Sequence, residues 1–197
     1  MKRIVIFALL CMFCLPMASM AKRDTGPPEW TFDNATELAE WRDSHDLSAT
    51  PSIVKVKTAN GTERSILKIT STGDNPYIYP GGSVPSWEPF SGYENNYIYI
   101  GVRVEKSDVW TVDYITGKNS EYSNEQSRRF NINASQDFQD IRLDMQWDGI
   151  IKGFRIHFGT GRNKITEIDY LSLRGQVEAT QTPRKLSTTW GRVKDLF

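Results

Sequence analysis

The stretch Ile165-Thr-Glu-Ile-Asp-Tyr-Leu-Ser-Leu173 decides the fold, because it has the pattern of the closing strand of an antiparallel β-sandwich. The alternation of apolar residues changes phase within this stretch. In a regular strand Ile168 and Tyr170 would lie on one face, and the leucines at 171 and 173 would lie on the other. A β-bulge, or burial on both faces, must reconcile the two sets.

Two carboxylates interrupt the same stretch. In a regular strand Glu167 and Asp169 share the face of the two leucines, so one of them can point toward the interior. A carboxylate in that position needs a cation or several hydrogen-bond donors.

The clearest strand runs from Tyr97 to Glu105, where apolar and polar residues alternate. Its apolar members are Ile98, Ile100, Val102 and Val104. Earlier in the chain, Asn60-Gly61 marks a tight hairpin turn between two further strands. About eight to ten such strands, separated by turn residues, predict an all-β fold: an antiparallel β-sandwich of the jelly-roll type or a related one.

The chain divides into four segments. Lys2 and Arg3 precede an apolar run and then small residues, so residues 1–21 are predicted to be a cleaved signal peptide, too short to favour a membrane span. Residues 22–28 form a linker, 29–174 the sandwich domain, and 175–197 a second linker with a short tail. We therefore expect an exported protein, located outside the cell, at its surface or in the periplasm.

Composition excludes several kinds of site. Both cysteines, Cys11 and Cys14, lie in the signal peptide, so the mature chain has no disulfide and no thiolate metal site. Removing Lys2 and Arg3 from the 24 basic residues leaves 22 against 24 acidic ones, a net charge of about −2. This balance gives no reason to expect nucleic acid as a partner.

The C-terminal tail has a character of its own. Trp190, Val193, Leu196 and Phe197 fall near helical spacing in a basic segment, which is typical of a small amphipathic helix. Two alternatives stay open: the tail docks on its own domain, or it is a sorting or protein-binding tail.

We expect no catalysis. His45 and His157 are the only histidines, and neither Gly-x-Ser-x-Gly nor His-Glu-x-x-His occurs. His157 lies between Ile156 and Phe158 and is predicted to be a polar-face residue rather than a metal ligand. Glycoside hydrolysis needs only two carboxylates, so the sequence does not exclude it, but context sets no pair apart.

Five motifs carry a resemblance to a known family. They are Trp30-Thr-Phe-Asp33, Ser71-Thr-Gly-Asp-Asn-Pro-Tyr77, Trp110, Trp147-Asp-Gly-Ile-Ile-Lys-Gly-Phe-Arg-Ile156 and Ile165-Thr-Glu-Ile-Asp-Tyr170. In this order they resemble the galactose-binding-like jelly rolls, which include carbohydrate-binding modules of secreted bacterial polysaccharide-degrading proteins. The resemblance implies a non-catalytic module that binds a polysaccharide or glycan. The alternative is a structural or adhesive domain that makes protein contacts.

A sugar site is expected at the loop end of the sandwich. Protein sites for sugars combine flat aromatic rings with a few fixed polar groups. Trp87, held between Pro85 and Pro89, is the predicted platform, and Tyr77 and Tyr79 are the predicted second wall. The polar groups nearby are Asp74, Asn75 and Glu88.

The concave face of a sheet is the other place for a sugar. Tyr97, Tyr99 and Arg103 share one face of their strand and are the candidates there. Trp110 shares its face with Val112 and Tyr114, so we expect it in the core and give it a reserve role only.

The resemblance also implies a structural calcium ion, because related jelly rolls often hold one between the first and last strands. The matching acids are Asp33 and Asp169. Carboxylate and backbone oxygens are ligands that calcium prefers. The alternative is that Asp33 begins the helix after it and Asp169 pairs with an arginine.

Overall fold

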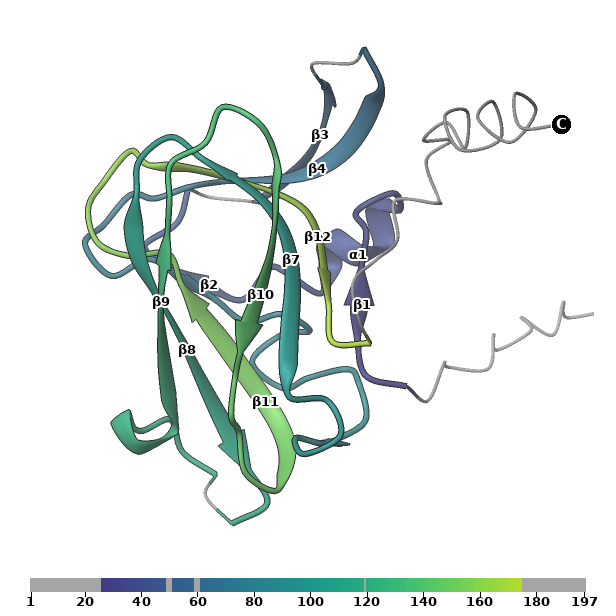
Figure 1. Cartoon of the computed structure of the whole chain (residues 1–197), viewed down its shortest axis with the longest axis vertical. Coiled ribbons are helices and arrows are strands. Elements are labelled where there is room, and N and C mark those ends of the chain that lie inside the picture. The colour runs from purple at the N-terminus through teal and green to yellow at the C-terminus, as the bar shows by residue number, and fades with distance from the viewer. Residues whose placement is uncertain (1–25, 49–50, 59–60, 119, 175–197) are drawn as a thin grey trace, which may run out of the picture.

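The computed structural model describes residues 26–48, 51–58, 61–118 and 120–174. They form an all-β domain of two antiparallel sheets that face each other across one core (Figure 1), so the predicted β-sandwich is confirmed. The predicted signal peptide and the predicted C-terminal tail lie outside the described residues. Within the described ranges, no helix has the length and apolarity needed to cross a membrane.

Sheet A contains the closing strand at its centre. Its order is β10 (Gln139–Asp144), β7 (Tyr97–Val104), β12 (Ile165–Ser172), β4 (Glu63–Thr70) and β3 (Ser52–Lys57), and the short β1 (Glu29–Trp30) also pairs with β12. The first and last described strands are therefore neighbours, with Trp30 opposite Leu171.

Sheet B carries the other half of the core. Its order is β2 (Ser44–His45), β5 (Tyr77–Ile78), β11 (Ile150–His157), β8 (Asp108–Thr116) and β9 (Ser127–Ile132), and the short β6 (Phe90–Ser91) also pairs with β11. A 3₁₀ turn, η1 (Asn124–Gln126), precedes β9.

The predicted hairpin joins β3 to β4. Lys57 pairs with Glu63, the N–H of Gly61 donates to the carbonyl of Thr58, and Gly61 has a φ of 80°, a value that suits glycine. Asn60 lies outside the described residues. Near this turn, the strands β3 and β4 extend beyond the rest of sheet A (Figure 1).

A β-bulge resolves the phase conflict in β12. Ile168 pairs with Val102 and Tyr170 with Gly101, so Asp169 is the extra residue. Ile168 and Leu171, three positions apart, are both fully buried in the core. The bulge turns Tyr170 outward over Gly101, where an added Cβ would lie 2.6 Å from the tyrosine ring, so this position requires glycine.

A short helix precedes a fully buried tryptophan. Asn34 caps α1 (Ala35–Ala39) by accepting from the N–H of Thr36, as its sequence predicts. Trp41 follows the helix and is fully buried, with its ring 5.4 Å from Trp30 and 5.2 Å from Phe32 in edge-to-face geometry.

Candidate functional site

Trp87 lies against the core. Its ring centroid is 5.5 Å from Phe90 and 6.0 Å from Phe154, and its indole N–H donates to the carbonyl of Pro80 at 3.3 Å. The residue is half-buried and packs on the core cluster. Trp87 therefore helps to close the sandwich, and its predicted role as a sugar platform stays a prediction.

The structure brings together three of the other predicted ligand residues. Tyr77 in β5 points away from the core, because its neighbour Ile78 fills the core side. The ring of His45 stacks on Tyr77 at 5.0 Å with an interplanar angle of 7°, and Tyr79 meets Tyr77 edge-to-face at 5.5 Å. Asn75 lies beside them, in contact with both His45 and His157.

Arg155 is at the centre of this group. Its guanidinium carbon lies 4.9 Å from the ring centre of Tyr77 and 4.5 Å from that of Tyr122, so it stands between two aromatic faces. Tyr79 and Tyr122 meet at 5.7 Å. Arg155 Nε donates to Oδ2 of Asp113 at 2.9 Å.

We call this set the Arg155 cluster. It consists of Tyr77, Tyr79, Asp113, Tyr122, Arg155 and His157. The pleat of sheet B accounts for its position, because Phe154 and Ile156 fill the core while Arg155 and His157 alternate with them on the outer face. Arg155 is directly opposite Asp113 in the β8–β11 pair.

Charge is fixed within the cluster. Burial by itself raises the pKa of the Asp113 carboxyl, but hydrogen bonds from His157, Arg155 and Ser127 outweigh burial and hold this pKa below its usual range. For Arg155, burial lowers the guanidinium pKa, and bonds with Tyr79 and Asp113 reverse this and raise it. The cluster thus holds a stable cation beside a stable anion.

Two tyrosines of the cluster, Tyr77 and Tyr122, stay neutral. Burial is the main cause that raises the phenol pKa of Tyr122, and it also raises that of Tyr77, with a further contribution from Tyr79. Their hydroxyls keep their protons at neutral pH and can donate as well as accept hydrogen bonds.

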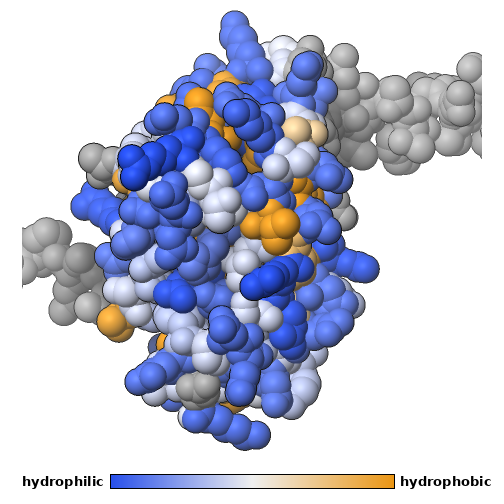
Figure 2. Space-filling model, turned by 90° about the vertical axis from the view of Figure 1, so that its left-hand side faces the viewer, coloured by the Kyte–Doolittle hydropathy of each residue, from blue (hydrophilic) through white to orange (hydrophobic). Residues whose placement is uncertain are grey.

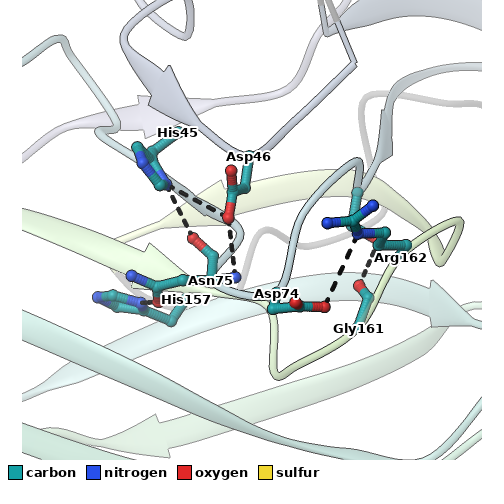
Figure 3. Close-up of polar contacts among 8 residues, drawn as sticks. His45, Asp46, Asp74, Asn75, His157, Gly161 and Arg162 are labelled. Carbon is teal, nitrogen blue, oxygen red and sulfur yellow. Dashed lines mark hydrogen bonds and ion pairs between the residues drawn. The ribbon is translucent and has the colours of Figure 1, made fainter.

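His157 lies on the polar outer face of β11, as predicted. Its Nε2 donates to Oδ2 of Asp113 at 2.9 Å, and its Nδ1 lies 3.1 Å from Oδ1 of Asn75. The backbone N–H of Asn75 donates to Asp46 at 3.0 Å, which fixes the loop that carries Asn75 (Figure 3).

Asp74 and Glu88 lie differently from Asn75. Asp74 is 3.9 Å from Arg162, with 80% of its side chain exposed, and Figure 3 shows it directed toward Arg162 rather than toward the histidines. Glu88 is an exposed residue of the loop before β6. Their predicted sugar contacts are open to test.

The candidates for a sheet-face sugar site lie on sheet A, whereas Trp110 lies in β8 of sheet B. Tyr97 and Tyr99 have ring centroids 6.2 Å apart on the outer face of sheet A, where Arg142 lies 4.6 Å from the ring centre of Tyr97. Arg103 is on the same face and pairs with Glu167. Trp110 is 1% exposed and packs on Phe158, as the face it shares with Val112 and Tyr114 predicts.

One of the expected calcium ligands, Asp169, is already paired with a cation. Asp169 forms an ion pair with Arg64, and both side chains are largely buried. Burial raises the Asp169 pKa, the Arg64 cation opposes this, and the charges of Asp140 and Asp33 add to the rise. Across the described ranges, no group of three or more His, Cys, Asp or Glu could hold a metal ion. The donor set suits calcium only if Arg64 leaves Asp169.

The comparisons with known proteins agree with the fold. No protein-family model matches the chain, and no curated protein matches it. An exo-β-agarase structure matches with a TM-score of 0.53 and 13% identity, over 73% of this chain and 24% of the agarase chain. The chain thus spans about a quarter of that enzyme, and the likeness establishes the shared β-sandwich fold.

Two smaller proteins also match, at lower TM-scores. A xylan-binding module of family 86 from Roseburia intestinalis has a TM-score of 0.42 and 10% identity, over 74% of this chain and 92% of that one. A carbohydrate-binding module of family 29 has a TM-score of 0.44 and 12% identity, over 74% of this chain and 87% of that one.

Proposed function

We propose that this protein is an exported, non-catalytic carbohydrate-binding module whose ligand lies on the Arg155 cluster. The observation that carries the proposal is the position of Arg155 between the rings of Tyr77 and Tyr122, bonded to Asp113. Rings that pack on sugar C–H faces, combined with planar charged groups for hydroxyls, make the chemistry of a sugar site.

Preorganisation supports this assignment. The side chains of Arg155, His157 and Asp113 are 22%, 16% and 11% exposed, so each is held by its neighbours yet reaches the surface. Groups that are fixed before binding lose little conformational entropy when a ligand arrives. The half-buried Tyr77 and Tyr79 add ring edges and hydroxyls beside them.

The chemistry of the cluster favours binding over hydrolysis. A glycosidase needs a carboxylic acid with a raised pKa that can give its proton to the leaving oxygen. Asp113 has a lowered pKa and accepts from two cationic or polar partners, Arg155 and His157. It therefore acts as a fixed hydrogen-bond acceptor.

The surface composition supports the same view. Large protein interfaces have an apolar centre. On the face in Figure 2, hydrophilic side chains prevail and apolar ones lie in small, separate patches. A structural or adhesive role through protein contacts is the competing function, and it would use isolated apolar side chains such as Val84 and Tyr93, which are 87% and 72% exposed.

A glycan array tests the function. We expect the full chain to bind at least one polysaccharide among plant, algal and bacterial samples, because the cluster offers ring edges, hydroxyls and a fixed guanidinium as partners for a sugar. A clean negative result over the whole array would overturn the proposal in favour of the structural role.

A further inference from the structure

A groove lies on the opposite side of the sandwich from the Arg155 cluster. It has a volume of about 640 Å³ and is formed on sheet A by β4, β7 and β12 together with the loop between β9 and β10. Its lining includes Lys68, Arg103, Glu105, Gln136, Ile165 and Glu167. This volume is in the range of small-ligand sites, roughly 300 to 1,000 Å³.

The charged groups of the groove are in register across three strands. Glu167 in β12 is paired with Lys68 on one side and with Arg103 on the other. Arg103 Nε donates to Glu167 at 2.5 Å, its Nη1 donates to the carbonyl of Gln136 at 3.4 Å, and its guanidinium lies 4.8 Å from the ring centre of Phe138. The planar Arg103 group is thus fixed on several sides.

The balance of charges in the groove favours a ligand without net charge. Lys68 and Arg103 are donors, and Glu105 and Glu167 are acceptors, so the four charges cancel. The two glutamates would repel an anionic ligand, and the two basic groups would repel a cationic one. Hydroxyl groups both donate and accept, and therefore match all four.

An apolar part completes the groove. Ile165 and Ala134 line it beside the charged groups, and the loop residue Ser135 is tied to β7 by its N–H, which donates to the carbonyl of Val104 at 3.1 Å. Apolar lining next to fixed polar groups suits a sugar ring, which has C–H faces and a hydroxyl rim.

From this geometry we infer that the groove is a second saccharide site, for a neutral oligosaccharide, on the sheet opposite the first. The inference rests on the proposed function for the ligand class but uses different residues. With a site on each sheet, one molecule binds two stretches of polysaccharide, and its retention on a polymer exceeds that of either site alone.

Titration calorimetry with defined hexasaccharides tests this inference on the full chain. Xylohexaose, cellohexaose and agarohexaose are the probes, and the number of sites per chain is the readout. Ala134→Trp fills the groove with a large ring and removes no hydrogen bond, because only the backbone N–H of Ala134 bonds, to Ser107. Asn133→Trp is the matched control, since Asn133 is the exposed neighbour outside the groove lining.

We expect two sites in the native chain and in Asn133→Trp, and one site in Ala134→Trp with an unchanged melting temperature. Tyr79→Ala, which damages the Arg155 cluster, should also leave one site. A single native site that is lost only in Tyr79→Ala overturns the groove and leaves the proposed function intact. A single native site that is lost only in Ala134→Trp supports the groove as the saccharide site and rules out the Arg155 cluster as one. No binding by any probe overturns both.

Discussion

Arg155 and Asp113 face each other across the β8–β11 pair, with Nε and Oδ2 2.9 Å apart. The same carboxylate oxygen accepts from His157 at 2.9 Å, so one buried anion orients two side chains that reach the surface. This relationship turns an ordinary alternating strand into a fixed polar surface beside three tyrosines.

Arg155→Lys should weaken polysaccharide binding about tenfold, because lysine keeps the charge but loses the planar group that donates to Asp113 and stacks between the rings. Affinity electrophoresis on a bound polysaccharide measures the effect. Arg129→Lys is the control, since Arg129 is an exposed residue of β9 on the same sheet. Equal retention of both variants would show that the guanidinium of Arg155 has no part in binding.

Asp113 should make the stability of the protein sensitive to acid. Its pKa is lowered in the folded state, so its contribution is fully present above the unfolded pKa of about 3.9 and disappears as pH falls through the folded value. Urea unfolding between about pH 5 and pH 2 should therefore give a shallower loss of stability for Asp113→Asn than for the native chain. Parallel pH profiles would mean that another carboxyl dominates acid unfolding.

Trp87→Ala should lower stability by about 2 to 3 kcal/mol, because the half-buried ring packs on Phe90 and Phe154 and leaves a gap when removed. Thermal or urea unfolding measures this. If instead stability is unchanged while polysaccharide retention falls, Trp87 is the sugar platform that its position between two prolines predicts.

Ile100→Ala should cost about 2 to 5 kcal/mol, because Ile100 is fully buried in the middle of β7. Lys106→Ala, at an exposed position just after that strand, is the comparison and should stay within roughly 0.5 kcal/mol of the native chain. If Ile100→Ala costs no more stability than Lys106→Ala, Ile100 lies outside the core.

Calcium is tested through the pair that competes with it. If Asp33 and Asp169 bind calcium, excess calcium raises the melting temperature and a chelator lowers it. Arg64→Ala should lower stability by about 3 kcal/mol, because it leaves the Asp169 carboxylate without its cation. It should also enlarge any effect of calcium. If neither calcium nor chelator changes the melting temperature of the native chain or of Arg64→Ala, Asp169 serves only as the partner of Arg64.

The sequence predicts the sandwich because its strands obey a period of two, as Ile98, Ile100 and Val102 do in β7. It also detects the conflict in β12, but it does not choose between a bulge and two buried faces. That choice depends on the register with β7, where Gly101 leaves room for the ring of Tyr170. Register is a property of two strands that are distant in sequence.

The candidate site was predicted in part. Tyr77, Tyr79 and Asn75 were predicted as ligand residues from the aromatic loop segment, and the structure brings them together, whereas His157 was predicted only as a polar-face residue. Asp113, Tyr122 and Arg155 were missed, because one sequence does not show that β11 lies between β5 and β8 or that the loop after β8 approaches them. The alternation of Arg155 with Phe154 and Ile156 was the available signal.

The central claim is that a polysaccharide binds at the Arg155 cluster, and a comparison of Tyr79→Ala with Tyr93→Ala tests it most directly. Tyr79 belongs to the cluster, whereas Tyr93 is 72% exposed and hydrogen-bonds Asp148 elsewhere. On the polysaccharide that the native chain binds best, affinity electrophoresis should show a retention loss for Tyr79→Ala and native retention for Tyr93→Ala, with both proteins folded. Native retention of a folded Tyr79→Ala protein would contradict the account.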